Sequence, residues 1–208
     1  MYSNCVVCQK EGEDRIFNNL SMKKCPNCGL VWRANFDLSA DYYQNKLINL
    51  KSKKLKERID NSRQRVRLFK KYLDLNNLCD VGCGEGTLLK VLEENGYQNL
   101  IGIEPSETQN DFAAANKLII KKGNLNDLTT LAGSGIKTVT MFHLLEHLTN
   151  PAESLKFIYN YLPQDGFLVM ETPDFESYSF RKSGYKHKLI YDEHLFYFNE
   201  KNLKEILA

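Results

Sequence analysis

The pattern of apolar and polar residues changes near Leu78. Beyond it, short apolar runs alternate with segments that have the spacing of amphipathic helices. That alternation predicts an α/β fold, with a parallel sheet and helices on both of its faces. The strands are expected in LCDVG, LIGIEPS, LIIKKGN, KTVTMFH and GFLVMETP. Helices are expected over about 87–95, about 108–116 and about 144–162, and in NEKNLKEILA at the end of the chain.

Two different segments precede this alternation. Residues 1 to about 36 are turn-rich and carry four cysteines, whereas residues about 40 to 75 are basic, with apolar residues at helical spacing. These contrasts predict three parts, which are a cysteine module over 1–38, a basic helical cap or linker over 39–75 and an α/β domain over 76–208. A sheet of this kind normally continues past the last helix, so we expect C-terminal strands to be missing.

The composition excludes few functions, but it indicates the cellular compartment in which the chain is expected. The chain has 208 residues and a formal net charge of +2, which gives no general attraction to nucleic acid or to membranes. It shows no signal peptide and no apolar run long enough for a membrane span. We therefore expect a cytoplasmic protein, in which cysteines serve as metal ligands or free thiols more often than as disulfides.

Four of the six cysteines form two Cys-x-x-Cys pairs. Cys5 and Cys8 make the first pair, and Cys25 and Cys28 make the second, with Gly29 suited to the tight turn that follows. Two such pairs supply four thiolates, the set that a tetrahedral structural zinc ion prefers. A segment with so few apolar residues also needs a metal ion in order to fold. A redox pair or unbound thiols is the alternative.

The stretch LCDVGCGEG places glycines directly after an expected strand. Its spacing is one residue tighter than the G-x-G-x-x-G of dinucleotide sites, and it lacks the Lys-Ser or Lys-Thr of a phosphate-binding loop. The glycines still allow a ligand to approach the backbone at the carboxyl end of a strand.

This stretch resembles motif I of class I S-adenosylmethionine-dependent methyltransferases. The resemblance implies a Rossmann-like sheet and S-adenosylmethionine as cofactor, with the loop supporting the methionine part and Glu104 accepting from the ribose hydroxyls. Gly123-Asn124 stands where the family often has Gly-Asp before the adenine, and FHLLEHLTNP resembles the segment after the fourth strand. The cofactor-binding residues implied are Asp80, Gly82, Cys83, Gly84, Glu104, Pro105, Asn124, Leu125, Phe142 and His143.

The late stretch YDEHLFYFN resembles deoxysugar C-methyltransferases, which also carry an N-terminal zinc module. That resemblance implies His194 as a base beside a carbonyl, Glu193 orienting it and Tyr191 donating to an enolate oxygen. Alternatively, this stretch only docks the last helix. His147 is a further catalytic candidate, although a packing role is as consistent with the sequence. A divalent ion held by His143, Glu146 and His147 is also left open.

The acceptor is expected to be a small molecule, such as a phosphorylated or nucleotide-linked sugar or a polysaccharide precursor. The loop over 174–188 is basic enough to hold such an acceptor, and Tyr42 and Tyr43 are weak candidates for capping its pocket. One alternative is an RNA methyltransferase, in which the basic stretch over 46–71 meets phosphates. Another is an inactive fold that binds partners. The sequence leaves the oligomeric state open.

Overall fold

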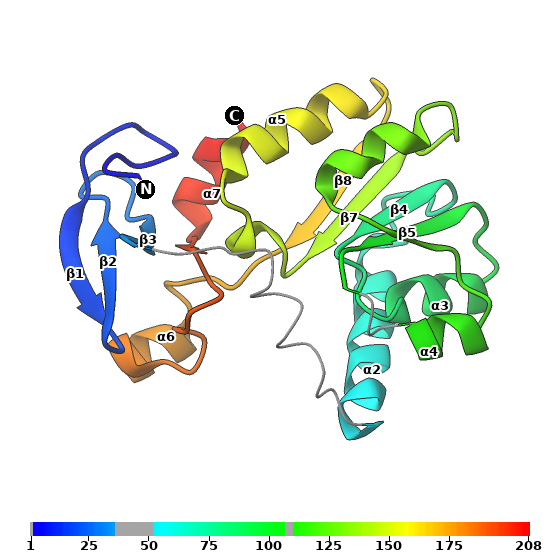
Figure 1. Cartoon of the computed structure of the whole chain (residues 1–208), viewed down its shortest axis with the longest axis horizontal. Helices are drawn as coiled ribbons and strands as arrows, with labels where there is room; N and C mark the ends of the chain where they lie inside the picture. The colour runs from blue at the N-terminus through cyan, green and yellow to red at the C-terminus, as the bar shows by residue number, and fades with distance from the viewer. Residues whose placement is uncertain (1, 36–51, 107–109) are drawn as a thin grey trace. The chain divides into compact units, whose positions relative to one another are not determined.

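The computed structural model describes residues 2–35, 52–106 and 110–208 (Figure 1). The chain divides into two compact units. One unit is drawn from Met1–Asp37, His143–Lys156 and Glu171–Ala208, and the other from Leu38–Phe142 and Phe157–Met170. The division into three domains expected from the sequence stays a prediction. Tyr42 and Tyr43 lie outside the described residues.

The second unit contains a five-stranded sheet with the order β6-β5-β4-β7-β8. The pairs β4–β5, β4–β7 and β5–β6 are parallel. The predicted α/β class is therefore confirmed. The strands are β4 (Leu78–Val81), β5 (Leu100–Glu104), β6 (Ile120–Lys122), β7 (Thr138–Phe142) and β8 (Phe167–Glu171).

Helices connect these strands in the expected alternation. Figure 1 shows α3 (Thr87–Glu94) and α4 (Asn110–Ala115) together on one side of the strands. After each of these helices, the chain continues into a strand one place nearer to the β6 edge of the sheet. By contrast, α5 (Pro151–Tyr161) connects β7 to β8 and so leads towards the opposite edge. Because such crossovers are right-handed, opposite directions place helices on opposite faces. A short 3₁₀ segment, η2 (Leu125–Leu131), leads from β6 to β7.

The basic segment forms α2 (Ser52–Phe69), which lies beside α3. Its apolar side joins a core cluster with β4 and α3, in which Val66 is buried and Ile59, Phe69 and Leu73 are packed against it. The helical spacing read from the sequence is thus confirmed over the described part of this segment.

The stretch expected to be one helix over about 144–162 is broken. It forms a 3₁₀ turn, η3 (Leu145–His147), and then α5, which begins at Pro151. Proline lacks a backbone N–H and belongs in the first turn of a helix. The side chain of Asn150 accepts a hydrogen bond from the backbone N–H of Glu153 at 3.3 Å, which caps the new helix.

The first unit contains a four-stranded antiparallel sheet with the order β1-β2-β3-β9. Two of its strands, β1 (Glu13–Phe17) and β2 (Leu20–Lys24), lie between the cysteine pairs in sequence, and β3 (Val31–Arg33) follows the second pair. The fourth, β9 (Phe196–Tyr197), comes from the C-terminal part of the chain and pairs with Val31 and Trp32. The remaining helical elements here are α6 (Tyr178–Ser183), η4 (Gly184–Lys186) and α7 (Glu200–Leu207). None of the helices described is long and apolar enough to cross a membrane.

Candidate functional site

The glycine loop follows β4 in the second unit and is tied to the neighbouring strand. The backbone N–H of Gly82 donates to the carbonyl of Ile103 at 2.8 Å, and that of Gly84 donates to Oε2 of Glu104 at 2.9 Å. The loop ends at Gly86, which has a φ of 85° and begins α3. A Cβ at Gly86 would lie 2.9 Å from the side chains of Leu118 and Ile120, so only glycine fits there.

Glu104 is the last residue of β5, and its carboxylate accepts hydrogen bonds from two backbone N–H groups. Besides the Gly84 N–H, it accepts the N–H of Ser106 through Oε1 at 3.1 Å. The hydroxyl of Ser106 is buried without a hydrogen-bond partner. Above Gly84, a Cβ would meet nothing within 4 Å. A carboxylate, an unpartnered hydroxyl and open space beside backbone therefore adjoin one another, which suits a ligand bearing sugar hydroxyls.

Asp80 lies within β4 and is buried. Its Oδ1 accepts a hydrogen bond from the hydroxyl of Thr140 on β7 at 2.6 Å. Burial raises the pKa of Asp80 to about 7, although the Thr140 hydrogen bond and the charge of Arg65 act in the opposite direction. Thr140 could not be recognised from its sequence position, because a threonine within a strand is common without any such role.

Cys83 points its side chain at the sheet. A Cβ at Gly102 of β5 would lie 2.5 Å from its Sγ, so a small residue in each position allows the loop to approach the strand. Burial, with smaller effects from the charges of Asp80 and Glu104, raises the pKa of the Cys83 thiol. The thiol is therefore unreactive, and only the backbone of Cys83 remains available for a ligand.

Asn124 and Leu125 begin η2 after β6. The Asn124 side chain accepts from the N–H of Asn126 at 2.9 Å, and its own N–H donates to Asp127 at 2.7 Å. Its amide oxygen thus caps the 3₁₀ segment, and its contact with adenine stays a prediction. Asp127 was missed in the sequence analysis, although a capping box is recognisable from its spacing.

The late residues lie in the first unit. Tyr191 Oη and His194 Nε2 are 2.8 Å apart, and His194 is buried. His147 Nδ1 lies 2.8 Å from the carbonyl oxygen of Glu193, and the backbone N–H of Leu195 donates to the carbonyl of Glu146 at 2.8 Å. The structure therefore brings Tyr191, His194 and His147 together, with Tyr191 hydrogen-bonded to the His194 ring. The orienting role of Glu193 stays a prediction.

Charge differs sharply between the histidines of this cluster. Burial, together with the charge of His147, lowers the pKa of His194 to about 4. Hydrogen bonds to Glu146 and Glu171 raise the pKa of His143 to about 9. At neutral pH His194 is a neutral imidazole, whereas His143 is a cation between two carboxylates. His143 also has a left-handed φ of 55°, which is uncommon for a residue other than glycine.

Two of the predicted cofactor residues, Phe142 and His143, are adjacent in sequence but belong to different units. Phe142 ends β7 in the second unit, where its ring stacks on Phe69 and lies under the guanidinium of Arg65, 4.5 Å from the ring centroid. His143 begins the next stretch of the first unit. Pro105 is exposed between Glu104 and Ser106. The roles assigned to these residues stay predictions.

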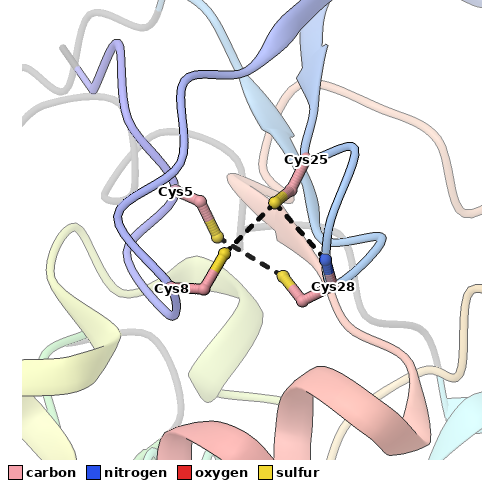
Figure 2. A group of neighbouring side chains, drawn as sticks. All are labelled: Cys5, Cys8, Cys25 and Cys28. Atoms are coloured by element: carbon pink, nitrogen blue, oxygen red, sulfur yellow. Dashed lines mark hydrogen bonds between the residues drawn. The ribbon is translucent and has the colours of Figure 1, made fainter.

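The four N-terminal cysteines converge as their spacing predicts. Figure 2 shows their sulfur atoms pointing toward one another, with Cys5 and Cys28 Sγ 3.5 Å apart and Cys8 and Cys25 Sγ 3.3 Å apart. Tetrahedral coordination at about 2.3 Å per Zn–S bond places sulfur atoms a little under 4 Å apart, so the set fits a structural zinc ion.

The backbone makes the same turn around each of the two cysteine pairs. Cys5 N–H donates to the carbonyl of Lys10 and Cys25 N–H to that of Leu30, each at 2.8 Å. Gln9 and Gly29, which directly follow the second cysteine of each pair, both have positive φ. Two loops of the same shape thus present two thiols each, which is the arrangement that a closed four-thiolate site needs.

Comparison with known proteins identifies the family of the chain. The family model described as "Methyltransferase domain" matches residues 52–208. A tRNA U34 carboxymethyltransferase of Helicobacter acinonychis is 30% identical over 103 residues, covering 46% of this chain and 39% of the relative. The chain thus spans about two fifths of the length of that curated relative.

Solved structures show the same fold. A SAM-dependent methyltransferase from Archaeoglobus fulgidus superposes with a TM-score of 0.60 and 25% identity, covering 72% of this chain and 66% of that one. Magnesium protoporphyrin IX methyltransferase from Synechocystis, solved with bound SAH, gives a TM-score of 0.55 at 17% identity, covering 80% and 79%. With three quarters of its length matched by the family model, the chain belongs to the methyltransferase-domain family of S-adenosylmethionine-dependent enzymes.

Proposed function

We propose that the second unit holds S-adenosylmethionine against the loop after β4, with Glu104 accepting hydrogen bonds from the ribose. The observation that carries this proposal is the carboxylate of Glu104, which is already hydrogen-bonded to Gly84 and Ser106 beside open space. The free hydroxyl of Ser106 supplies a further polar contact. The backbone at Gly84 leaves room for the methionine part.

The reaction is an in-line displacement at the sulfonium methyl. A lone pair of the acceptor forms the new bond to the methyl carbon while the C–S bond breaks, and its electron pair returns to sulfur to leave S-adenosylhomocysteine. A proton lost by the acceptor passes to a base or to solvent. Because the methyl group is already activated, the enzyme's main contribution is to place the acceptor in line.

We further propose a small-molecule acceptor, of which a phosphorylated or nucleotide-linked sugar is the leading example. Three of the four arginines of α2 support this choice because they are engaged within the unit. Arg58 Nε donates to Glu85 at 2.8 Å, Arg63 pairs with Asp60 at 3.0 Å, and Arg65 lies over Phe142. Arginines that are paired in this way present less charge to a phosphate backbone than free ones would.

An RNA acceptor is the second candidate. It is favoured by the curated relative, whose name gives it a tRNA substrate and which aligns with nearly half of this chain. The near-neutral net charge of +2 does not support it, because RNA affinity draws largely on phosphate contacts.

Transfer of a radiolabelled methyl group distinguishes the candidates. The protein is incubated with labelled S-adenosylmethionine and a cell extract freed of endogenous donor, and the products are then separated by ultrafiltration with and without ribonuclease. A small-molecule acceptor gives label that passes the filter whether or not ribonuclease is added and that chromatography separates from unreacted S-adenosylmethionine. An RNA acceptor gives retained label that ribonuclease releases, which would overturn the proposal. Donor binding without any transfer would indicate an inactive fold.

A further inference from the structure

A second set of metal-ligating side chains lies in the first unit, apart from the four cysteines. Glu146 and His147 come from the 3₁₀ turn η3, and His194 comes from the stretch just before β9. One ligand atom from each lies within 4.8 Å of the others. Glu146 and His194 are 1% and 3% exposed. We infer that Glu146, His147 and His194 form a binding site for a divalent transition-metal ion.

The tautomer of His147 suits a ligand. Its Nδ1 lies 2.8 Å from the carbonyl oxygen of Glu193, which can only accept, so Nδ1 must carry the proton. With Nδ1 engaged in this way, Nε2 is the nitrogen placed to bind an ion. Metal-binding histidines are commonly fixed in this way by a backbone carbonyl that takes the other ring N–H.

Glu146 supplies the strongest single sign of a missing partner. Its Oε1 lies 3.3 Å from His143 Nδ1 and 4.0 Å from His194 Nε2, whereas its Oε2 is buried without any hydrogen-bond partner. A buried carboxylate oxygen with no partner is costly, and native proteins rarely keep one without a reason. A cation that binds both oxygens of the Glu146 carboxylate would remove that cost.

The donor set selects the class of ion. Two imidazoles and one carboxylate suit Zn²⁺, Fe²⁺, Mn²⁺ or Co²⁺, whereas Mg²⁺ and Ca²⁺ prefer sites made of oxygen ligands alone. Coordination at about 2.0–2.2 Å requires the three ligand atoms to approach one another by roughly an ångström. Tyr191 Oη is hydrogen-bonded to His194 Nε2 at 2.8 Å, so an ion bound at Nε2 displaces that hydrogen bond. Three protein ligands leave coordination positions for water or for an oxygen of a bound molecule.

This assignment changes the role of His194. A histidine whose Nε2 ligates a metal ion is not available as a base, so the base role implied by the sequence and the metal role exclude each other. The inference does not depend on the proposed acceptor, because metal content is measured without any methyl transfer. Affinity for S-adenosylhomocysteine, measured alongside, reports separately on the proposed cofactor site.

The test is the metal content of the whole chain after exposure to excess Zn²⁺ and dialysis. We expect about two ions per chain in the wild type, one held by the four cysteines and one by this cluster. Glu146→Gln, which keeps the size of the side chain, should lower the content to about one. His187→Gln is the matched control, because His187 is equally buried but contacts Ser179 and Leu189 instead of a carboxylate. It should keep both ions.

Loading with Co²⁺ shows whether the cysteine module of each variant is still folded. A four-thiolate Co²⁺ site gives a strong sulfur-to-metal charge-transfer band, which reports that the cysteine module is intact. We expect Glu146→Gln to keep that band and to lose the weaker visible absorption of a nitrogen- and oxygen-ligated site. His194→Gln should do the same. A wild-type protein that takes up a single ion with Zn²⁺, Mn²⁺, Fe²⁺ and Co²⁺ alike would overturn the inference, as would a second ion retained by both variants.

Discussion

Alanine at Gly84 is the most direct probe of the proposed cofactor cradle. Gly84 has a φ of 54°, and an added Cβ would meet nothing within 4 Å, so the methyl group would project into the space assigned to the methionine part. Gly96 provides a matched control at the far end of α3. It has a φ of 86°, and a Cβ there also meets nothing within 4 Å.

The two substitutions share one energetic cost and differ in another. A side chain in the left-handed region costs about 1–2 kcal/mol, which for a chain of this size lowers the unfolding midpoint by about 2–8 °C. Both variants should show this loss. Only at Gly84 does the new methyl group compete with a ligand, and overpacking of that kind costs about 1–3 kcal/mol. We therefore expect S-adenosylhomocysteine affinity to fall by about 5- to 150-fold in Gly84→Ala alone.

Calorimetric titration with S-adenosylhomocysteine measures the affinities, and thermal denaturation without ligand measures the shared strain. The comparison of the two variants removes any effect of reduced stability on binding. If Gly84→Ala binds within about twofold of Gly96→Ala, the space above Gly84 is not the cofactor cradle. That outcome refutes the cradle whether both affinities stay near the wild-type value or both fall, because a shared loss would come from backbone strain and not from contact with the ligand.

Glu104→Gln should weaken S-adenosylhomocysteine binding by about 10- to 100-fold, because a charge-assisted hydrogen bond contributes about 1.5–3 kcal/mol. Glu94→Gln, at an exposed position, controls for the loss of a charge. Equal affinity of the two variants would refute the role of Glu104. Since burial raises the pKa of Asp80 from 3.8 to about 7, ionised Asp80 costs folding stability increasingly as the pH rises between these values. Asp80→Asn removes that cost and should raise the unfolding midpoint more at about pH 8 than at about pH 5; equal gains would contradict the shift. Chelation of the cysteine-bound metal should shift the fluorescence emission of Trp32 to longer wavelength, because this single tryptophan is only 1% exposed in the folded module. Unchanged emission after verified metal loss would show that the cysteine module folds without the metal.

Local patterns in the sequence predicted much of the second unit correctly. The strand before the glycine loop and the helix expected over about 87–95 correspond to β4 and α3, because both have strong apolar periodicity and a glycine at their junction. The helix expected from about residue 144 was interrupted, although Asn150 and Pro151 mark a helix start. Pro151 was recognised in the sequence as a break, but the apolar residues before it were still assigned to the helical stretch.

Contacts between distant parts of the chain were beyond sequence reasoning. The two residues of β9 carry no strand pattern of their own and are defined only by pairing with β3. The Ser106 hydroxyl and the Thr140–Asp80 hydrogen bond likewise depend on which strands become neighbours. The cysteine spacing was informative because a metal ion imposes its geometry on nearby residues, whereas the metal-ligating cluster joins η3 to a segment more than forty residues later.

The pairing of β9 with β3 gives the cysteine module a role beyond its own stability. The carbonyl of Cys28 accepts hydrogen bonds from the side chains of Asn199 and Asn202, at 3.4 and 3.3 Å, at the start of α7. The stretch that carries Tyr191 and His194 runs directly into this anchored segment. A metal ion that fixes Cys28 therefore also fixes the backbone that positions His194 beside Glu146. The fold thus uses one metal site to hold the ligands of a second in place, which explains why a module at one end of the chain is completed by a strand from the other.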